Sequence, residues 1–268
     1  MTQAATQGLD RMDAQLLLLH VLGRPGAQRG WLIAHDDEPL SAEAQQRFDA
    51  LCRRRLDGEP VAYLTWHKEF FGLGLHVDPR VLVPRPDTET LVDWALELLR
   101  DKAAPRVIDL GTGSGAIALA IQHALPAAQV EAVDRSAAAL DVARTNAARL
   151  GLPVVFRQAD WLQGSGRYDL IVSNPPYVAA GDPHLPALRH EPVEALVAGP
   201  DGLDDLRAIT AAAFAHLRPG GWLLLEHGWD QAEAVRALLA TAGLTEVASR
   251  EDLAGIARCS GGRRLELG

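Results

Sequence analysis

Residues 107–121, which read VIDLGTGSGAIALAI, decide the fold: an apolar strand runs into a glycine-rich turn, and the turn into an apolar helix. Glycines permit positive φ and close approach of the backbone to a ligand. The N-terminus of the helix offers free N–H groups to a carboxylate or phosphate. The turn also fits the loose dinucleotide pattern Gly111-x-Gly113-x-x-Ala116. We therefore expect a cofactor to contact the residues of this turn, Gly111, Thr112, Gly113, Ser114 and Gly115.

From this stretch onward, strands and helices alternate along the chain. Such alternation is typical of an α/β fold with a parallel sheet covered by helices on both faces. We predict strands over residues 107–110, 129–133, 154–158, 168–173, 221–226 and 244–250, and helices over 116–121, 136–149, 204–217 and 231–242. In such open sheets ligands bind at the carboxyl edge of the strands.

Two acids and an indole stand where predicted strands end. Asp134 closes the strand over residues 129–133, and its carboxylate can accept from both hydroxyls of a ribose. That geometry serves NAD and S-adenosylmethionine equally. Asp160 and Trp161 follow the next strand; Asp160 can accept from an adenine amino group and Trp161 can cover the base.

The segment Asn174-Pro175-Pro176-Tyr177 ends the strand over residues 168–173. Two consecutive prolines lack N–H donors and fix φ, so the strand must stop and turn rigidly. The Asn174 side-chain oxygen and the Pro175 carbonyl are two acceptors beside the Tyr177 ring. They suit a planar NH2 group, which carries two donors.

These motifs together resemble the S-adenosylmethionine (SAM)-dependent methyltransferases that bear an Asn-Pro-Pro-Tyr motif. The chain more closely resembles the protein-(glutamine-N5) methyltransferases that modify peptide-chain release factors. Trp66 departs from the family, which usually has Gly there, and the tail after Gly255 is shorter and richer in Arg. The resemblance runs from about Glu59 to Arg264 through residues 59–64, 69–73, 83–89, 111–115, 173–177 and 224–228.

The resemblance implies a cofactor, a substrate and a set of roles. The cofactor is SAM, its product is S-adenosylhomocysteine, and the substrate is the glutamine of the Gly-Gly-Gln motif in release factors. The resemblance implies that Asn174, Pro175 and Tyr177 are catalytic and that Asn174 also binds the cofactor. It further implies that these three residues bind the substrate together with Pro176 and Arg85. The resemblance also implies a Rossmann-like sheet of seven strands whose last strand, near 258–267, is antiparallel.

The resemblance and the helix pattern divide the chain into three parts. We expect a helical substrate-recognition domain over residues 1–70, a hairpin linker over 71–86, and a methyltransferase domain over 87–268. Residues 178–200 form a long loop beside the site, which we expect to be a mobile lid or recognition surface. The resemblance implies that His227 is structural or lines the pocket.

Composition excludes several classes of protein. The 268 residues are 48% hydrophobic and carry a formal net charge of −9, which disfavours non-specific binding to a phosphate backbone. Residues 1–13 lack a secretion signal, and no stretch approaches 18 uninterrupted apolar residues, so no membrane association is expected. Cys52 and Cys259 have no metal-ligand spacing and indicate a reducing compartment, the cytoplasm. We expect no metal, including at His184 and His190.

Four alternative functions stay open at this point. A ribosomal-protein glutamine N5-methyltransferase would have nearly the same catalytic core. An adenine-N6 methyltransferase of nucleic acids would hold an amine in the same way, although the net charge counts against it. A SAM-binding adaptor without activity is disfavoured because the acceptor motif is present. An NAD-dependent dehydrogenase is the most remote of the four.

Overall fold

The computed structural model describes residues 8–265 and divides the chain into two compact units. The first unit ends at His67 and includes Pro186–His190 from a later loop, while the second comprises the rest. The first seven residues of the predicted N-terminal domain, and residues 266–267 of the predicted last strand, lie outside the described part. Among residues 8–265, no helix is both long enough and apolar enough to cross a membrane.

The first unit is built from short helices, as the sequence predicts. The side chain of Asp10 caps the first long helix, and the Ser41 hydroxyl caps α4 by accepting from the Ala44 N–H at 3.1 Å. Leu17 and Leu19 pack with Phe48 and Cys52 in a small core. Its helices are α2 (Arg11–Val21), α3 (Arg29–Ala34), α4 (Ala42–Leu56) and α5 (Val61–Thr65), with the 3₁₀ helix η1 (Gly26–Gln28).

A hairpin opens the second unit but is shorter than the sequence predicts. Strands β1 (Lys68–Phe70) and β2 (Leu73–Leu75) pair antiparallel around Gly72, which has a φ of 75°. The sequence predicts a hairpin linker over residues 71–86, whereas the two paired strands lie within residues 68–75. Pro79 and Pro84 lack N–H groups, and the Asp78 carboxylate accepts from the Arg80 N–H at 3.0 Å, so the chain turns here.

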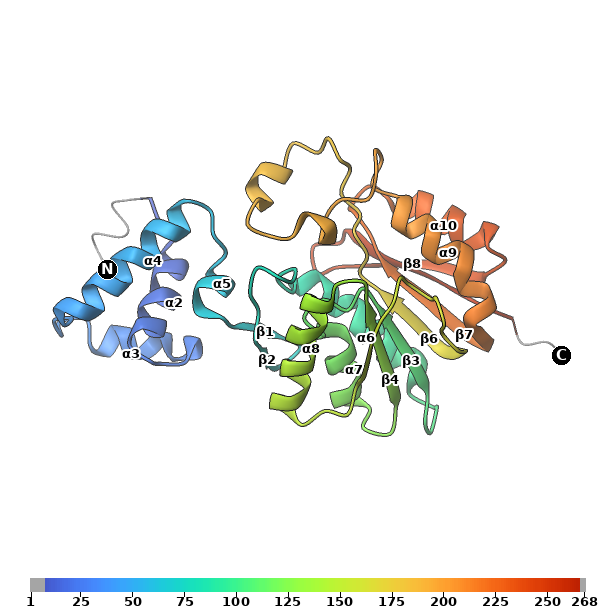
Figure 1. Cartoon of the computed structure of the whole chain (residues 1–268), viewed down its shortest axis with the longest axis horizontal. Helices are drawn as coiled ribbons and strands as arrows, with labels where there is room; N and C mark the ends of the chain where they lie inside the picture. Colours follow the sequence, from blue (N-terminus) through green and yellow to red (C-terminus); the bar gives the residue numbers. More distant parts are fainter. Residues whose placement is uncertain (1–7, 266–268) are drawn as a thin grey trace. The chain divides into compact units, whose positions relative to one another are not determined.

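A seven-stranded sheet forms the centre of the second unit (Figure 1). Its spatial order is β5-β4-β3-β6-β7-β9-β8, and β9 alone runs opposite to the other six strands, which confirms the predicted fold. Strand β7 begins earlier than predicted because Leu217 already pairs with Tyr168 ahead of a bulge. The strands are β3 (Arg106–Leu110), β4 (Gln129–Asp134), β5 (Val155–Gln158), β6 (Tyr168–Ser173), β7 (Leu217–Glu226), β8 (Thr245–Glu251) and β9 (Ala257–Arg263).

Helices cover both faces of this sheet (Figure 1). Helices α6 (Glu89–Leu99), α7 (Ala116–Ala124) and α8 (Ala137–Leu150) lie on one face, and α9 (Asp204–His216) and α10 (Ala232–Thr241) on the other. Ile108 and Leu110 of β3 pack in one cluster with Leu206 of α9 and Val235 of α10. Because β3 lies between β4 and β6, the crossovers leave it in opposite directions, and its carboxyl edge is the switch point where ligands bind.

Candidate active site

The glycine turn after β3 adopts backbone angles that side chains rarely tolerate. Gly111, Gly113 and Gly115 have φ of 69°, 54° and 86°. A Cβ on Gly111 would lie 3.2 Å from the Trp161 ring, whereas one on Gly113 would meet no atom within 4 Å. The N–H groups of Gly111 and Thr112 both donate to the Val133 carbonyl, at 2.9 and 3.0 Å. The turn is therefore tied to β4 and leaves Gly113 open on one side.

Asp109 stabilises the turn through hydrogen bonds to its buried carboxylate. Its carboxylate accepts from the Thr112 hydroxyl at 2.6 Å and from the Ala118 N–H at 3.3 Å. The side chain is buried, and burial raises the pKa of Asp109 to about 7. This acid fixes the start of α7, whose first N–H groups have no acceptor within the helix.

Asp134 is held rigidly at the end of β4. One carboxylate oxygen accepts from the Gly113 N–H and the other from the Ser136 N–H, each at 2.9 Å. Ser136 also caps α8 by accepting from the Ala139 N–H at 3.2 Å. Each oxygen of Asp134 keeps a further lone pair for a ligand hydroxyl.

Trp161 forms a wall beside the glycine turn. Its backbone is left-handed, with a φ of 46°, and its ring packs close to Gly111. Asp205, whose pKa is raised by burial, lies beside the Trp161 side chain. Asp160, next to it, is exposed and has the Gln163 side chain 3.5 Å away. The Trp161 ring thus packs against the glycine turn, while Asp160 remains free to accept from a ligand.

Asn174 sits just beyond β6 with its side-chain amide oriented by a threonine. Its Nδ2 donates to the Thr88 hydroxyl at 3.2 Å, while its Oδ1 is buried and has no hydrogen-bond partner among residues 8–265. The preceding Ser173 hydroxyl donates to the Leu110 carbonyl at 2.7 Å and fixes the strand end. Since buried polar atoms are nearly always paired, the lone oxygen is an acceptor that awaits a donor.

Pro175 and Tyr177 are not among the residues that line the cavity, although Asn174 and Pro176 beside them are. The Tyr177 hydroxyl donates to Glu226 at 3.2 Å, and its carbonyl accepts from Gln231 at 3.0 Å. Burial, followed by the charge of Glu226, raises the pKa of the Tyr177 hydroxyl. Burial also raises the pKa of Glu226 to about 7.

Arg85, predicted to bind the substrate, forms an ion pair within the protein. Its guanidinium lies 2.5 Å from the Glu191 carboxylate, which also accepts from the Val83 N–H at 3.0 Å. Glu191 belongs to the long loop over residues 178–200. That loop is anchored here and by a bridge between Val178 and Val197, so part of it is fixed.

His227 is buried and bonds other parts of the protein. Its ring nitrogens lie 2.8 Å from the Ser260 hydroxyl and 2.9 Å from the Gly228 carbonyl. Burial lowers its pKa, so the ring is neutral at neutral pH. No cluster of potential metal ligands occurs within the described part of the chain.

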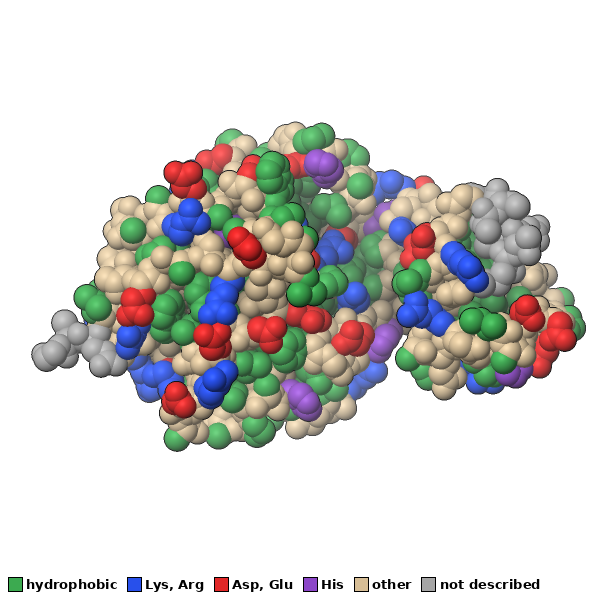
Figure 2. Space-filling view, turned by 180° about the vertical axis from the view of Figure 1, so that it is seen from behind, with side chains coloured by type: hydrophobic (Ala, Val, Ile, Leu, Met, Phe, Trp, Pro, Cys, Tyr) green, Lys and Arg blue, Asp and Glu red, His purple; other side chains and the backbone are tan. Residues whose placement is uncertain are grey.

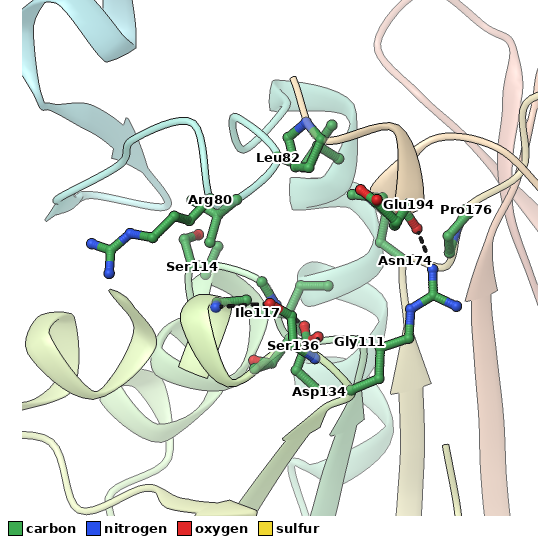
Figure 3. Close-up of a pocket in the computed structure, with 18 of the residues that line it drawn as sticks. Arg80, Leu82, Gly111, Ser114, Ile117, Asp134, Ser136, Asn174, Pro176 and Glu194 are labelled. Atoms are coloured by element: carbon green, nitrogen blue, oxygen red, sulfur yellow. Dashed lines mark hydrogen bonds between the residues drawn. The ribbon is translucent and has the colours of Figure 1, made fainter. Parts of the chain in front are cut away.

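A cavity of about 500 Å³ brings most of the predicted residues together (Figure 3). It is lined by Gly111, Thr112, Gly113, Ser114, Asp134, Asp160, Trp161, Asn174 and Pro176, whereas Gly115, Pro175, Tyr177 and Arg85 are not among the lining residues. Figure 3 shows Asp134 and Ser136 at one end of the group and Asn174 with Pro176 at the other. A volume of this size is typical of a cofactor site.

Several lining residues were not predicted from the sequence, including Arg80, Leu82, Thr88, Ser136 and Glu194. Ser136 could have been found, because a serine just after a strand and before a helix is a typical N-cap. Thr88 lies in the segment that carries the family resemblance, but nothing in its spacing indicates that it meets Asn174. Arg135 reaches the Glu194 carbonyl at 2.8 Å, a contact that only the folded loop creates.

Two family models match the chain. The PrmC N-terminal domain matches residues 2–65, and the methyltransferase small domain matches residues 89–194. A release factor glutamine methyltransferase of Xylella fastidiosa strain Temecula1 is 54% identical over 265 residues, which cover 97% of this chain and 95% of that protein. The chain belongs to the release factor glutamine methyltransferase family.

Further relatives agree with this family. A release factor glutamine methyltransferase of Bordetella pertussis is 54% identical over 263 residues, covering 96% of each chain. Among solved structures, a methyltransferase from Pyrococcus furiosus aligns with a TM-score of 0.56 at 20% identity, over 80% of this chain and 98% of that one. That likeness shows the methyltransferase fold.

Proposed function

We propose that this protein transfers a methyl group from SAM to the side-chain amide nitrogen of the glutamine in the Gly-Gly-Gln motif of peptide-chain release factors. The observation that carries the proposal is the unpaired, buried Oδ1 of Asn174 on the wall of the cavity. It is a fixed acceptor placed at the carboxyl edge of a methyltransferase sheet. The family and its relatives' names supply the class of substrate.

The cavity fits SAM by the chemistry of its donors and acceptors. Asp134 would hold the ribose hydroxyls, because its oxygens are positioned by two backbone N–H groups and keep free lone pairs. Trp161 and Asp160 would hold the adenine. The glycine turn and the first N–H groups of α7 would hold the carboxylate, since Ala116 and Ile117 line the cavity. When bound, SAM supplies an electrophilic methyl group on a sulfonium.

The residues of the Asn-Pro-Pro-Tyr segment would orient the acceptor amide. An amide nitrogen is a poor nucleophile because its lone pair is delocalised into the carbonyl. Asn174 Oδ1 and the Pro175 carbonyl would accept its two N–H groups and hold the lone pair in line. Such preorganised acceptors also stabilise positive charge that develops on the nitrogen, so no strong general base is required.

We propose a protein partner and no nucleic acid. Acidic and basic side chains are interspersed over the face shown in Figure 2, and the net charge is −9. A sequence-independent nucleic-acid site needs a concentrated positive face. The N-terminal unit, with residues 1–70 as its predicted extent, would bind the release factor. The reaction would take place in the cytoplasm, a compartment in which the free thiols of Cys52 and Cys259 stay reduced.

Binding measurements test the cofactor. Calorimetry should show binding of SAM and S-adenosylhomocysteine, and no binding of NAD. Losing a charge-assisted hydrogen bond costs roughly 1.5–3 kcal/mol, so Asp134→Ala should weaken SAM binding by about tenfold or more. Tighter binding of NAD than of SAM would end this assignment.

Labelled SAM tests the substrate class. The protein should be incubated with equal concentrations of a release factor, ribosomal proteins, or an adenine-containing oligonucleotide. We expect label in the release factor, with none in a release factor whose Gly-Gly-Gln glutamine is replaced by alanine. Faster labelling of a ribosomal protein or of the oligonucleotide would replace the proposed substrate.

A further inference from the structure

Glu226 is a buried acid that lies outside the cofactor cavity. It ends β7 and its side chain is 2% exposed. Its Oε1 accepts from Tyr177, while its Oε2 has no hydrogen-bond partner among residues 8–265. Burying a carboxyl group costs free energy unless its oxygens are hydrogen-bonded or paired with a charge. Arg258, a cation whose charge acts on it, forms ion pairs with Asp87 and Asp252 instead.

Thr88 connects this acid to the active site. The Thr88 side chain is buried at the end of the 3₁₀ helix η2 (Pro86–Thr88) and lines the cavity. Its hydroxyl accepts from Asn174 Nδ2 at 3.2 Å. Thr88 and Tyr177 both lower the pKa of Glu226 against the effect of burial, which places the Thr88 side chain beside this acid. Glu226 therefore lies beside Thr88, which is hydrogen-bonded to Asn174, and accepts from Tyr177, which belongs to the same Asn-Pro-Pro-Tyr segment as Asn174.

The polarity of this chain of hydrogen bonds determines how the Asn174 amide is oriented. A hydroxyl has a single proton. If Thr88 gives that proton to Glu226, it can only accept from Asn174. The amide must then turn its NH2 toward Thr88 and its oxygen away from it. This is the arrangement observed, with Nδ2 on Thr88 and Oδ1 unpaired.

We propose that Thr88 and Glu226 are a positioning pair for methyl transfer: through Thr88 they fix the carbonyl of Asn174 as an acceptor, and through the Tyr177 hydroxyl they hold the turn of the Asn-Pro-Pro-Tyr segment. The proposal rests on the proposed function, because the acceptor held in place is the one assigned to the substrate amide. Neither residue needs to touch the reacting atoms.

Matched variants of Thr88 test the pair. Thr88→Val keeps the shape and removes the hydroxyl, whereas Thr88→Ser keeps the hydroxyl. In single-turnover transfer at saturating SAM and release factor, Thr88→Val should lose at least tenfold in rate, and Thr88→Ser should recover most of it. The Kd of SAM should stay within about threefold of the parent value in both. A rate for Thr88→Val within about threefold of the parent would overturn the proposal.

A double-mutant cycle tests whether the two residues act together. Glu226→Gln keeps the shape of the side chain and replaces one of its two acceptor oxygens by an NH2 donor. Residues of one network are not additive, so the Thr88→Val/Glu226→Gln protein should be no slower than the slower single variant. A rate loss equal to the product of the two single losses would show that Glu226 does not act through Thr88.

A structural measurement separates this proposal from the proposed function. The side-chain amide signals of Asn174 can be assigned in ¹⁵N spectra of the whole protein by their loss in Asn174→Asp. They should be unchanged in Thr88→Ser and shifted in Thr88→Val and Glu226→Gln. If the parent labels no release factor, the proposed function fails, yet these spectra still decide the pair. Unshifted signals in Thr88→Val would refute it.

Discussion

At the scale of single residues, Asn174 determines what the site can do. The two ends of its amide have different functions. Nδ2 donates to Thr88 and fixes the side chain, whereas Oδ1 has no partner among residues 8–265 and can accept from a ligand. Asp134 is likewise fixed by two backbone N–H groups before any ligand arrives. Both residues are therefore held by the protein itself, as preorganised catalysis requires.

We predict that Asn174→Ala reduces turnover far more than SAM binding. The variant lacks the acceptor, and losing one preorganised hydrogen bond typically lowers the rate by about 10²–10³. Asn174→Asp keeps an oxygen but adds negative charge and loses the NH2 that bonds Thr88, so it should also fall, though no more than Asn174→Ala. Single-turnover transfer with saturating SAM and release factor measures this. A rate for Asn174→Ala within about threefold of the parent would exclude Asn174 as the anchor.

The strand-end residues could be predicted from sequence, whereas their partners could not. Asp134, Trp161 and Asn174 each follow an apolar run, and the carboxyl ends of parallel strands meet at one edge. Thr88 reaches Asn174 across 86 positions of the chain, and Glu226 reaches Tyr177 across 49. No periodicity reports such contacts. Arg85 was assigned to the substrate on resemblance alone, and its ion pair with Glu191 depends on a folded loop.

At the scale of elements, short segments with regular patterns were predicted well and turns were not. Helix α8 lies within one residue of its predicted bounds, 136–149, and β6 ends where Pro175 and Pro176 require it. The hairpin was overextended because alternating residues beyond Leu75 mimic a strand. Strand β9 contains no apolar run from which it could have been predicted. Its buried positions are occupied by the small residues Cys259, Ser260, Gly261 and Gly262, which lie between neighbouring strands.

The end of α5 offers a test of backbone strain. Trp66, where the family usually has Gly, is the C-cap of α5 and adopts a left-handed φ of 56°. A Cβ in this conformation costs roughly 1–2 kcal/mol. Trp66→Gly should therefore be more stable than Trp66→Ala by about 1 kcal/mol, because both remove the indole and only Ala keeps the Cβ. Urea unfolding measures the difference, and equal midpoints for the two variants would contradict it.

At the scale of the whole molecule, the two units are proposed to divide recognition from chemistry. All residues that line the cavity belong to the second unit. Deleting residues 1–67 should therefore leave SAM affinity within a few-fold while abolishing methylation of the intact release factor. Circular dichroism and calorimetry of the truncated protein serve as controls for folding. Undiminished turnover on the intact factor would remove the recognition role from the N-terminal unit.

Two buried acids make stability depend on pH. Burial raises the pKa of Asp109 and of Glu226 from ordinary values of 3.8 and 4.5 to about 7, with Asp134 and Asp87 adding to the shifts. The native state thus keeps protons that the unfolded chain releases, and this contribution is lost as pH rises toward 7. The lowered pKa of His227 makes stability rise with pH instead. The pH dependence of the parent protein therefore does not isolate the contribution of the two acids.

Comparison with a variant isolates the contribution of Glu226. The free energy of unfolding of Glu226→Gln, relative to the parent, should rise between about pH 4.5 and pH 7, because glutamine has no proton to lose. Glu233→Gln, at an exposed position of α10, is the control and should show no such trend. A difference between parent and Glu226→Gln that does not change with pH would contradict the assigned shift.

The position of the transferred methyl group decides whether the glutamine of the Gly-Gly-Gln motif is the substrate. A release factor incubated with SAM and the parent protein should be digested and its fragments mapped by mass spectrometry. We predict one added methyl group, on the side-chain nitrogen of the glutamine in the Gly-Gly-Gln motif, and none after incubation with Asn174→Ala for the same time. A methyl group on any other residue, or an unmodified release factor, would contradict it.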